Sequence, residues 1–209
     1  MIMAIIQARM SSKRLPGKVM LPIKGKPMLQ WVIEAALNAD MVDQVVVATS
    51  LDSTDNPMVD FMIENDFCMI YRGSLNDVLH RFYDISNRYK PSHIVRLTAD
   101  CPRLSSSLID QVIIHHLTSS VDYTRNSKII DNQRVGAPSG FNVEVFTANA
   151  LNKTANEAHD SYDREHVTPF MQRGQFRVAH LLDDEFPSGK WSVDTFEDYK
   201  KVRKEMEDD

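Results

Sequence analysis

The first twenty residues, "MIMAIIQARMSSKRLPGKVM" (residues 1–20), hold the pattern that decides the fold. The apolar run of residues 1–6 predicts a buried strand. The segment that follows it carries four cations: Arg9, Lys13, Arg14 and Lys18. A strand seldom carries so many charges, and the adjacent Pro16 and Gly17 exclude a surface helix. We therefore expect a loop at the carboxyl end of a strand, built to hold a strongly anionic ligand.

The overall composition makes that basic loop a local feature. The chain has 24 Lys and Arg against 29 Asp and Glu, a net charge of −5, whereas nucleic-acid-binding domains are usually basic. A small ligand with several negative charges is therefore favoured over a polymer. No apolar run approaches the ~18 residues that span a membrane, and the N-terminus lacks the pattern of a secretory signal. Cys68 and Cys101 are too few for a disulfide framework, so we expect a cytoplasmic protein.

Apolar, β-branched runs alternate with helical segments in the first half of the chain. Strands are predicted at residues 44–50, 67–72 and 93–100. Helices are predicted from Pro27 onward, at about 57–65 and, from the capping-box spacing of Ser74 and Asp77, at about 75–89. The nearly continuous apolar character of the strands is typical of a parallel sheet that is covered on both faces. The class predicted is α/β, with a doubly wound, mostly parallel sheet.

The pattern loosens after residue 118. Strand-like stretches follow at residues 121–126, 141–146 and 176–182, with a helix predicted at about 162–173. The short apolar run at 190–194 ends in Asp194, and Thr195 and Asp198 then have capping-box spacing for a last helix of about 196–207. The length of the chain predicts one domain, residues 1–209, in which about 120–175 form a smaller extension.

Ligands of open α/β sheets bind beyond the carboxyl ends of the strands, which selects the loop of residues 7–18. Arg offers a fork of donors to phosphate oxygens and Lys a mobile point charge, so several cations on one loop suit a triphosphate. Gly17 is the only glycine there, which excludes a GxxxxGK[ST] loop and a GxGxxG turn. Any one of these cations, taken alone, would be read as a solvated surface residue.

Two aspartates close apolar runs at the same predicted edge. Asp100 is the last residue of the strand predicted at 93–100 and lies two residues before Pro102. Asp194 precedes the last predicted helix. Asp100 could simply shape its turn, and Asp194 could favour the start of its helix. Together with a polycationic loop, however, two such carboxylates favour a metal–phosphate site, because Mg²⁺ takes one or two carboxylates plus phosphate oxygens.

The stretch "RGSLNDVLHRF" (residues 72–82) is open to two interpretations. Asp77 could cap its helix and pair with Arg81, or Arg72, Ser74 and Asp77 could read a nucleobase beyond the strand end. His166 is a lone histidine among charges, a position that is more often structural than catalytic. The adjacent His115 and His116 have no carboxylates at ligand spacing, which argues against a zinc site.

With these residues in view, the chain resembles the cytidylyltransferases that make CMP-activated acidic sugars, and more closely their spore-coat polysaccharide biosynthesis branch. The resemblance covers nearly the whole chain and follows the order of its motifs: "IIQARMSSKRLPGKVM", "GKPML", "VVVATS", "YRGSLNDVLHRF", "RLTADCP", "GFNVEVF", "REHVTPF" and "VDTFEDY". It departs from the sialic-acid and ketodeoxyoctonate enzymes at Thr98-Ala99-Asp100 and in "RGSLNDV", which leaves the base and the acceptor sugar open.

The resemblance implies a Rossmann-like nucleotidyltransferase (GT-A-like) fold, with a second-half extension that binds the acceptor and often supports homodimers. It implies that CTP is bound by Ala8, Arg9, Ser12, Lys13, Arg14, Lys18, Arg72, Ser74, Asp77 and Thr98. It places Mg²⁺ on Asp100 and Asp194, and gives catalytic roles to Arg9, Lys18 and Asp100. The acceptor would lie in the second half, near Asn126, Asn142, Glu144 and His166.

The reaction implied moves CMP from CTP to an acidic sugar, releases pyrophosphate and serves surface polysaccharide biosynthesis. An acceptor oxygen attacks the α-phosphorus in line, so that catalysis consists of positioning and electrostatic stabilisation. Two other hypotheses stay open. A glycosyltransferase that uses a preformed sugar nucleotide would free a nucleotide instead of pyrophosphate. A nucleotide-binding protein without turnover would release neither.

Overall fold

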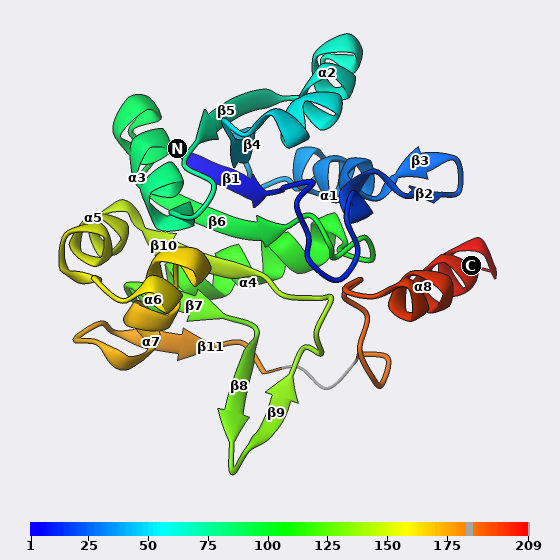
Figure 1. The fold of residues 1–209 in the computed structure, drawn as a ribbon. Helices are drawn as coiled ribbons and strands as arrows, with labels where there is room; N and C mark the ends of the chain where they lie inside the picture. The colour runs from blue at the N-terminus through cyan, green and yellow to red at the C-terminus, as the bar shows by residue number, and fades with distance from the viewer. Residues whose placement is uncertain (183–185, 209) are drawn as a thin grey trace.

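The computed structural model describes residues 1–182 and 186–208. Its centre is a seven-stranded sheet in the order β11-β7-β10-β6-β1-β4-β5, with helices on both faces (Figure 1). The strands are β1 (Ile2–Gln7), β4 (Gln44–Ser50), β5 (Met69–Gly73), β6 (His93–Thr98), β7 (Tyr123–Arg125), β10 (Glu144–Thr147) and β11 (Val178–His180). β6, β1, β4 and β5 run parallel, and only β10 is antiparallel to its neighbours. The α/β, mostly parallel prediction is confirmed.

The helices cover the sheet from both sides. They are α1 (Met28–Leu37), α2 (Asn56–Asn65), α3 (Val78–Tyr89), α4 (Ser106–Ser119), α5 (Ala148–Glu157), α6 (Ser161–His166), α7 (Pro169–Arg173) and α8 (Phe196–Asp208). Side chains of α1, α2, α4 and α8 pack on one face, and those of α3, α5 and α7 on the other. Within the described ranges, none of these helices has the length and apolar character needed to cross a membrane.

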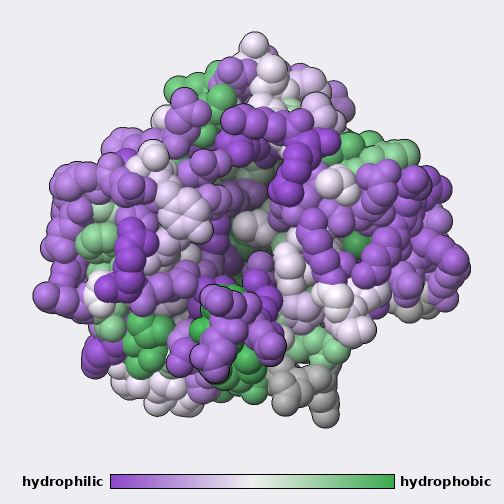
Figure 2. Space-filling view, turned by 60° about the horizontal axis from the view of Figure 1, so that its bottom comes forward, coloured by the Kyte–Doolittle hydropathy of each residue, from purple (hydrophilic) through white to green (hydrophobic). Residues whose placement is uncertain are grey.

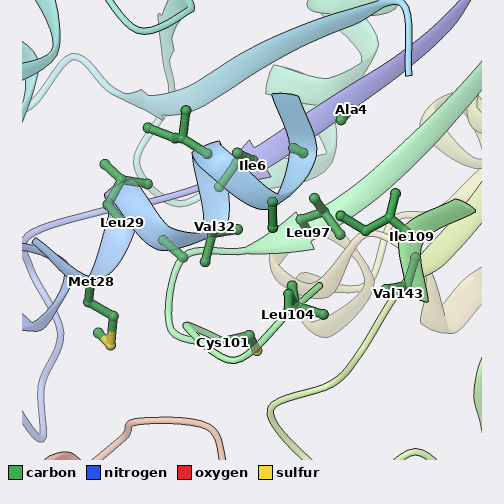
Figure 3. Packing of buried hydrophobic residues seen from close by; sticks show 14 of the residues in the cluster. Ala4, Ile6, Met28, Leu29, Val32, Leu97, Cys101, Leu104, Ile109 and Val143 are labelled. Carbon is green, nitrogen blue, oxygen red and sulfur yellow. The ribbon is translucent and has the colours of Figure 1, made fainter. Parts of the chain in front are cut away.

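The alternation of side chains along β1 explains why both faces need covering. Ala4 and Ile6 point into one core, while Met3 and Ile5 point into the other, and all four are fully buried. A central parallel strand therefore buries apolar surface on both of its sides, and this burial is the main source of its stability. Figure 3 shows the first of these cores, where side chains of α1 pack over β1 and β6.

Several short elements lie outside the main sheet. They are η1 (Lys18–Met20), η2 (Ser53–Asp55), β2 (Pro22–Ile23) paired with β3 (Lys26–Pro27), and β8 (Ser127–Ile130) paired with β9 (Gln133–Gly136). The β8–β9 hairpin projects from the body of the molecule (Figure 1). Neither this hairpin nor α5 could be predicted from the sequence, because both are short and mostly polar.

The single helix predicted at 162–173 is wrong: two helices, α6 and α7, stand there. The chain breaks at Val167, whose φ of 69° lies in the left-handed region, before Pro169 begins α7. Pro169 has no N–H to donate to a carbonyl of the preceding turn, so the hydrogen bonds of α6 cannot continue through it. The break turns His166, the last residue of α6, toward the sheet edge described below.

Of the two predicted capping boxes, one forms and the other does not. Thr195 and Asp198 form the predicted reciprocal box, since Asp198 N donates to Thr195 Oγ1 and Thr195 N donates to Asp198 Oδ2. The helix predicted from residue 75 instead begins at Val78, with Asp77 as its N-cap. Ser74 Oγ accepts from the backbone N–H of Asp77, so the serine closes a turn that precedes the helix.

The run at 190–194 is extended but pairs with no strand, which corrects the prediction of a strand end at Asp194. Val193 N donates to Asp100 O over 2.9 Å, and Trp191 N and Ser192 N both donate to Ser139 O. These bonds hold the segment across the carboxyl edge of β6. Asp194 therefore lies beside Asp100, although it does not end a strand. The two aspartates were predicted to lie at the same edge of the sheet.

Candidate active site

The carboxyl ends of β1 and β6 open one cleft. The two strands are neighbours in register, Gln7 opposite Thr98, so the loop after β1 and the turn after β6 begin side by side. The cleft has a volume of about 480 Å³. Figure 2 shows the hollow on this face with hydrophilic side chains on both of its sides.

The lining of the cleft is strongly cationic for an acidic protein. Six lining side chains are Lys or Arg, and three are Asp or Glu. The complete lining is Gln7, Ala8, Arg9, Ser12, Lys13, Arg14, Lys18, Val19, Val78, Arg81, Arg96, Thr98, Ala99, Asp100, Cys101, Ser139, Asn142, Glu165, His166, Ser192 and Asp194. A concave surface with this excess of fixed positive charge attracts multiply charged anions.

A buried carboxylate fixes the start of the basic loop. Asp55 accepts hydrogen bonds from Met10 N (2.7 Å), Thr49 Oγ1 (2.8 Å) and both the N–H and the hydroxyl of Ser50. Burial acts to raise the pKa of Asp55, but these donors outweigh it and hold the pKa below its ordinary value. Asp55 therefore stays ionised while it positions the loop, a role that the sequence analysis missed.

The other end of the loop turns at Gly17. Its φ of 72° is left-handed, and its N–H donates to Met10 O over 2.8 Å, so residues 10–17 close into a compact turn. Glycine adopts this conformation without the strain that a Cβ would bring. The turn delivers Lys18, the first residue of η1, into the cleft.

Lys18 bridges the two aspartates. Its Nζ lies 2.7 Å from Asp100 Oδ2, 3.1 Å from Asp194 Oδ1 and 2.7 Å from the carbonyl oxygen of Val193. The lysine is 9% exposed, so water screens these contacts little. One cation can therefore reach oxygens of both carboxylates at once.

Asp194 is the meeting point of three cations. Besides Lys18, it pairs with Arg14 NH2 and Lys190 Nζ, each at 2.9 Å. Burial acts to raise its pKa, but Lys190 and Lys18 outweigh burial and hold the pKa below its ordinary value. The carboxylate therefore remains ionised, as an oxygen ligand for a metal ion must be.

The structure brings most of the predicted site residues together. Ala8, Arg9, Ser12, Lys13, Arg14, Lys18, Thr98, Asp100, Asp194, Asn142 and His166 all line the cleft. Arg9 NH2 also pairs across it with Glu165 of α6 over 3.2 Å. That ion pair links the basic loop to the second half of the chain.

Three residues predicted to contact the nucleotide, Arg72, Ser74 and Asp77, lie outside the lining of this cleft. Arg72 donates to the carbonyl oxygens of Ser50 and Asp52, which ties β5 to the end of β4. Asp77 caps α3 and pairs with Arg164 over 2.7 Å. Their side chains hold the wall of the cleft together, so a nucleotide role for them stays a prediction.

Arg81 stands in that wall, and the pairing with Asp77 considered from the sequence is absent, since Arg164 takes that carboxylate. Arg81 is 2% exposed, donates to Ser74 O over 2.9 Å and leaves its Nε without a partner. Burial and the charge of Arg9 lower its pKa to about 10, so it is still protonated at neutral pH. The sequence hinted at it only through its place one turn into α3.

A second hollow, of about 410 Å³, continues the cleft over the second half of the chain. The two hollows share Arg96, Asn142 and His166. All four predicted acceptor residues line it, although two of them also have structural roles. Asn126 bonds the backbone of Phe141 and Val143, and Glu144 is buried against Arg96, Tyr123 and Thr168.

Two other potentially reactive side chains, Cys101 and His116, are buried. Cys101 lines the cleft, but burial raises the pKa of its thiol far above neutrality, so it is no nucleophile at pH 7. His116 is buried against Thr124 and His93. Among the described residues no cluster of three or more His, Cys, Asp or Glu is placed to hold a metal ion.

A cytidylyltransferase family model matches residues 3–209. The chain belongs to the cytidylyltransferase family. It is 34% identical to the spore coat polysaccharide biosynthesis protein SpsF of Bacillus subtilis, over 97% of this chain and 85% of that protein. A solved cytidylyltransferase from Leptospira borgpetersenii is 29% identical, with a TM-score of 0.87 over 97% of this chain and 84% of that one.

A more distant solved structure shares the fold. It is a CMP:2-keto-3-deoxy-manno-octonic acid synthetase in complex with CTP. It is 18% identical to this chain, with a TM-score of 0.72 over 99% of this chain and 98% of that one. The predicted nucleotidyltransferase type of α/β fold and the predicted family are both confirmed.

Proposed function

We propose that this cytidylyltransferase moves CMP from CTP to a sugar acceptor, with release of pyrophosphate, in surface polysaccharide biosynthesis. The observation that carries the proposal is the meeting of four loop cations with Asp100 and Asp194 in one cleft. Membership of the cytidylyltransferase family supports the nucleotide, and the similarity to SpsF supports the pathway. The CTP complex of the distant synthetase is consistent with the same nucleotide.

The basic residues of the cleft would contribute to triphosphate binding in different ways. Arg9 and Arg14 offer paired N–H donors to phosphate oxygens, and Lys13 and Lys18 add mobile positive charge. Charge accumulates on the leaving pyrophosphate as the bond to the α-phosphorus breaks, and these cations stabilise it. In this proposal Arg9, Lys18 and Asp100 have the catalytic roles that the resemblance implies.

The residues present also fit a magnesium ion. Oxygens of Asp100 and Asp194 both reach one cation, as their distances of 2.7 and 3.1 Å from Lys18 Nζ demonstrate. Mg²⁺ is bound in this way by one or two carboxylates together with substrate phosphates. When bound, it would supply charge stabilisation at the α-phosphate.

We further propose that the extension of about residues 120–175 binds the acceptor and pairs two copies of the chain in a homodimer. The exposed Ile129 and Ile130 on the β8–β9 hairpin support a contact there. Sedimentation of the wild type against a variant with both residues changed to Ser would test the dimer. A monomeric wild type would refute it.

The test of the reaction is product analysis with an Asp100→Asn variant. We expect the wild type to release pyrophosphate from CTP in a metal- and acceptor-dependent way, and the variant to lose at least 100-fold in rate while its melting temperature stays close to that of the wild type. Full activity in Asp100→Asn would contradict the assignment. A freed nucleotide in place of pyrophosphate would indicate a glycosyltransferase, and tight nucleotide binding without turnover would indicate a binding protein.

A further inference from the structure

Two arginines meet on one hydroxyl at the edge of the second hollow. Arg125, the last residue of β7, donates to Ser127 Oγ over 3.0 Å, and Arg134, on β9, donates to the same oxygen over 2.8 Å. Their guanidinium groups are therefore less than two hydrogen-bond lengths apart. The β8–β9 hairpin brings them together, since Ser127 opens the hairpin and Arg134 lies in its returning strand (Figure 1).

Neither arginine forms an ion pair with an Asp or Glu anywhere in residues 1–182 and 186–208. Their remaining partners are neutral: Gln172 for Arg125, and Ala137 O and Asn142 for Arg134. Such close like charges are normally separated by an anion or spread apart by the fold.

Glu144, which lies opposite Arg125 on β10, has other hydrogen-bond partners. Glu144 pairs with Arg96 and accepts hydrogen bonds from Tyr123 and Thr168. The charge of Glu144 still acts on both arginines, without forming an ion pair with either. The Nε of Arg125 is buried and has no acceptor. The arrangement is costly for the protein alone and becomes favourable when a negative group is added.

The position of the pair connects it to the nucleotide cleft. Arg125, Ser127 and Asn142 line the second hollow, and Arg134 contacts both Ser127 and Asn142. Asn142 also lines the cleft that holds the basic loop. A molecule could therefore place one end at the arginines and another end at the triphosphate.

We propose that Arg125 and Arg134, held together by Ser127, form an anion subsite that binds a carboxylate or phosphate group of the acceptor. The inference rests on the proposed transferase function and adds to it the residues that read the charge of the acceptor. Guanidinium forks match both anions with paired hydrogen bonds. Glu144, another predicted acceptor residue in the same hollow, pairs with Arg96.

The test measures sugar binding by calorimetry to the full chain with CTP and Mg²⁺ present. Three probes separate the possible sources of charge: glucuronate as a sugar acid, glucose 6-phosphate as a sugar phosphate, and glucose as the neutral reference. We expect one of the two anions to bind at least about tenfold more tightly than glucose, the equivalent of one strong charged contact. Whichever anion binds identifies the class of acceptor.

Two variants and a matched control test the residues themselves. Arg125→Gln and Arg134→Gln should each weaken binding of the preferred anion by about tenfold or more and leave the affinity for CTP within about twofold. Lys128→Gln removes a charge from the same hairpin; within the described residues Lys128 forms no hydrogen bond or ion pair with Arg125 or Arg134, so this variant should change neither affinity. Arg134 is exposed, so its replacement leaves folding intact.

Three results would overturn the inference: neither anion binding better than glucose, equal affinity in both arginine variants, or an equal loss in Lys128→Gln. Failure of the proposed function would look different. A chain that bound no CTP, yet bound an anion in an Arg125-dependent way, would keep the subsite and lose the cytidylyl transfer.

Discussion

At the scale of single residues, Lys18 occupies the position between Asp100 and Asp194 that a divalent cation would take. The lysine therefore satisfies the carboxylates in the free protein and, in the proposed site, would oppose the entry of a metal ion. In the proposed reaction a triphosphate would offer Lys18 and Arg14 stronger partners and draw them from the aspartates. Metal and nucleotide should consequently bind with positive cooperativity, because each removes an obstacle to the other.

This gives a prediction for Lys18→Gln. We expect the variant, without nucleotide, to bind Mn²⁺ about tenfold more tightly than the wild type, because two carboxylates lose their internal counter-ion. Its rate of pyrophosphate release should nevertheless fall at least 100-fold. Mn²⁺ titration followed by electron paramagnetic resonance gives the first quantity.

Lys13→Gln is the matched control, since Lys13 lines the same cleft and forms no ion pair with a carboxylate in the described part of the chain. It should weaken CTP binding and leave Mn²⁺ binding to the free protein unchanged. An unaltered Mn²⁺ affinity in Lys18→Gln would show that the lysine does not shield the aspartates.

At the scale of elements, the site depends on a crossing of two segments with no regular structure. Gly140 has a φ of 109°, and a Cβ there would lie only 2.3 Å from the carbonyl carbon of Trp191. The chain of residues 190–194 thus passes directly over Gly140, and this contact sets the position of Asp194. In the sequence, Gly140 itself is the only signal of this crossing.

We expect Gly140→Ala to lower the free energy of unfolding by about 2 kcal/mol or more, because both the left-handed conformation and the overlap oppose a side chain. It should also weaken Mg²⁺-dependent CTP binding, since Asp194 must move with its segment. Urea denaturation and calorimetry give the two quantities.

Gly25→Ala separates the effect of the left-handed conformation from that of the overlap with Trp191. Gly25 also has a positive φ, 77°, but nothing lies within 4 Å of a Cβ there. That variant should lose about 1 kcal/mol of stability and keep its CTP affinity. Equal effects at both glycines would mean that the crossing does not position Asp194.

Local signals were predicted well and distant ones poorly. The box of Thr195 and Asp198 needs only four consecutive residues, and it forms as predicted. The same spacing at Ser74 and Asp77 misplaced a helix start, because Asp77 rather than Ser74 is the N-cap and accepts from the N–H of His80. The pairing of Asp77 with Arg164, 87 residues away, had no local signal. Arg125 and Arg134 meet only through the register of a hairpin that no pattern in the sequence indicated.

At the scale of the whole molecule, the parallel strands could be predicted because burial on both faces leaves a continuous apolar run. The basic loop could be assigned to the site because the carboxyl ends of such strands share one edge. The segments that lie over that edge could not be predicted. Those that carry His166 and Asp194 are placed by long-range contacts such as the hydrogen bond from Val193 N to Asp100 O.

The buried His116 predicts how the stability of the whole molecule depends on pH. Burial, followed by the charge of His93, lowers its pKa from 6.5 to about 4, so the unfolded chain binds a proton there more readily than the folded one. Stability is therefore complete above about pH 6.5 and falls as the pH drops toward 4, by about 2 to 3 kcal/mol in all. His93, whose pKa is also lowered by burial, adds to the loss, and Asp122 opposes it.

Chemical denaturation at pH 7, 6, 5 and 4.5 measures this dependence. His116→Gln should flatten most of it, while His115→Gln, a change at the neighbouring position that is not buried, should keep the wild-type slope. A wild-type stability that stayed constant from pH 7 to 4.5 would contradict the assignment.

The most direct test of the cytidylyltransferase account is calorimetric binding of CTP, UTP, ATP and GTP, each with Mg²⁺, to the wild type and to Asp100→Asn. The account predicts that CTP binds at least about tenfold more tightly than the other three, and that the substitution weakens this Mg²⁺-dependent binding. Equal binding of all four nucleotides, or a preference for another base, would contradict it.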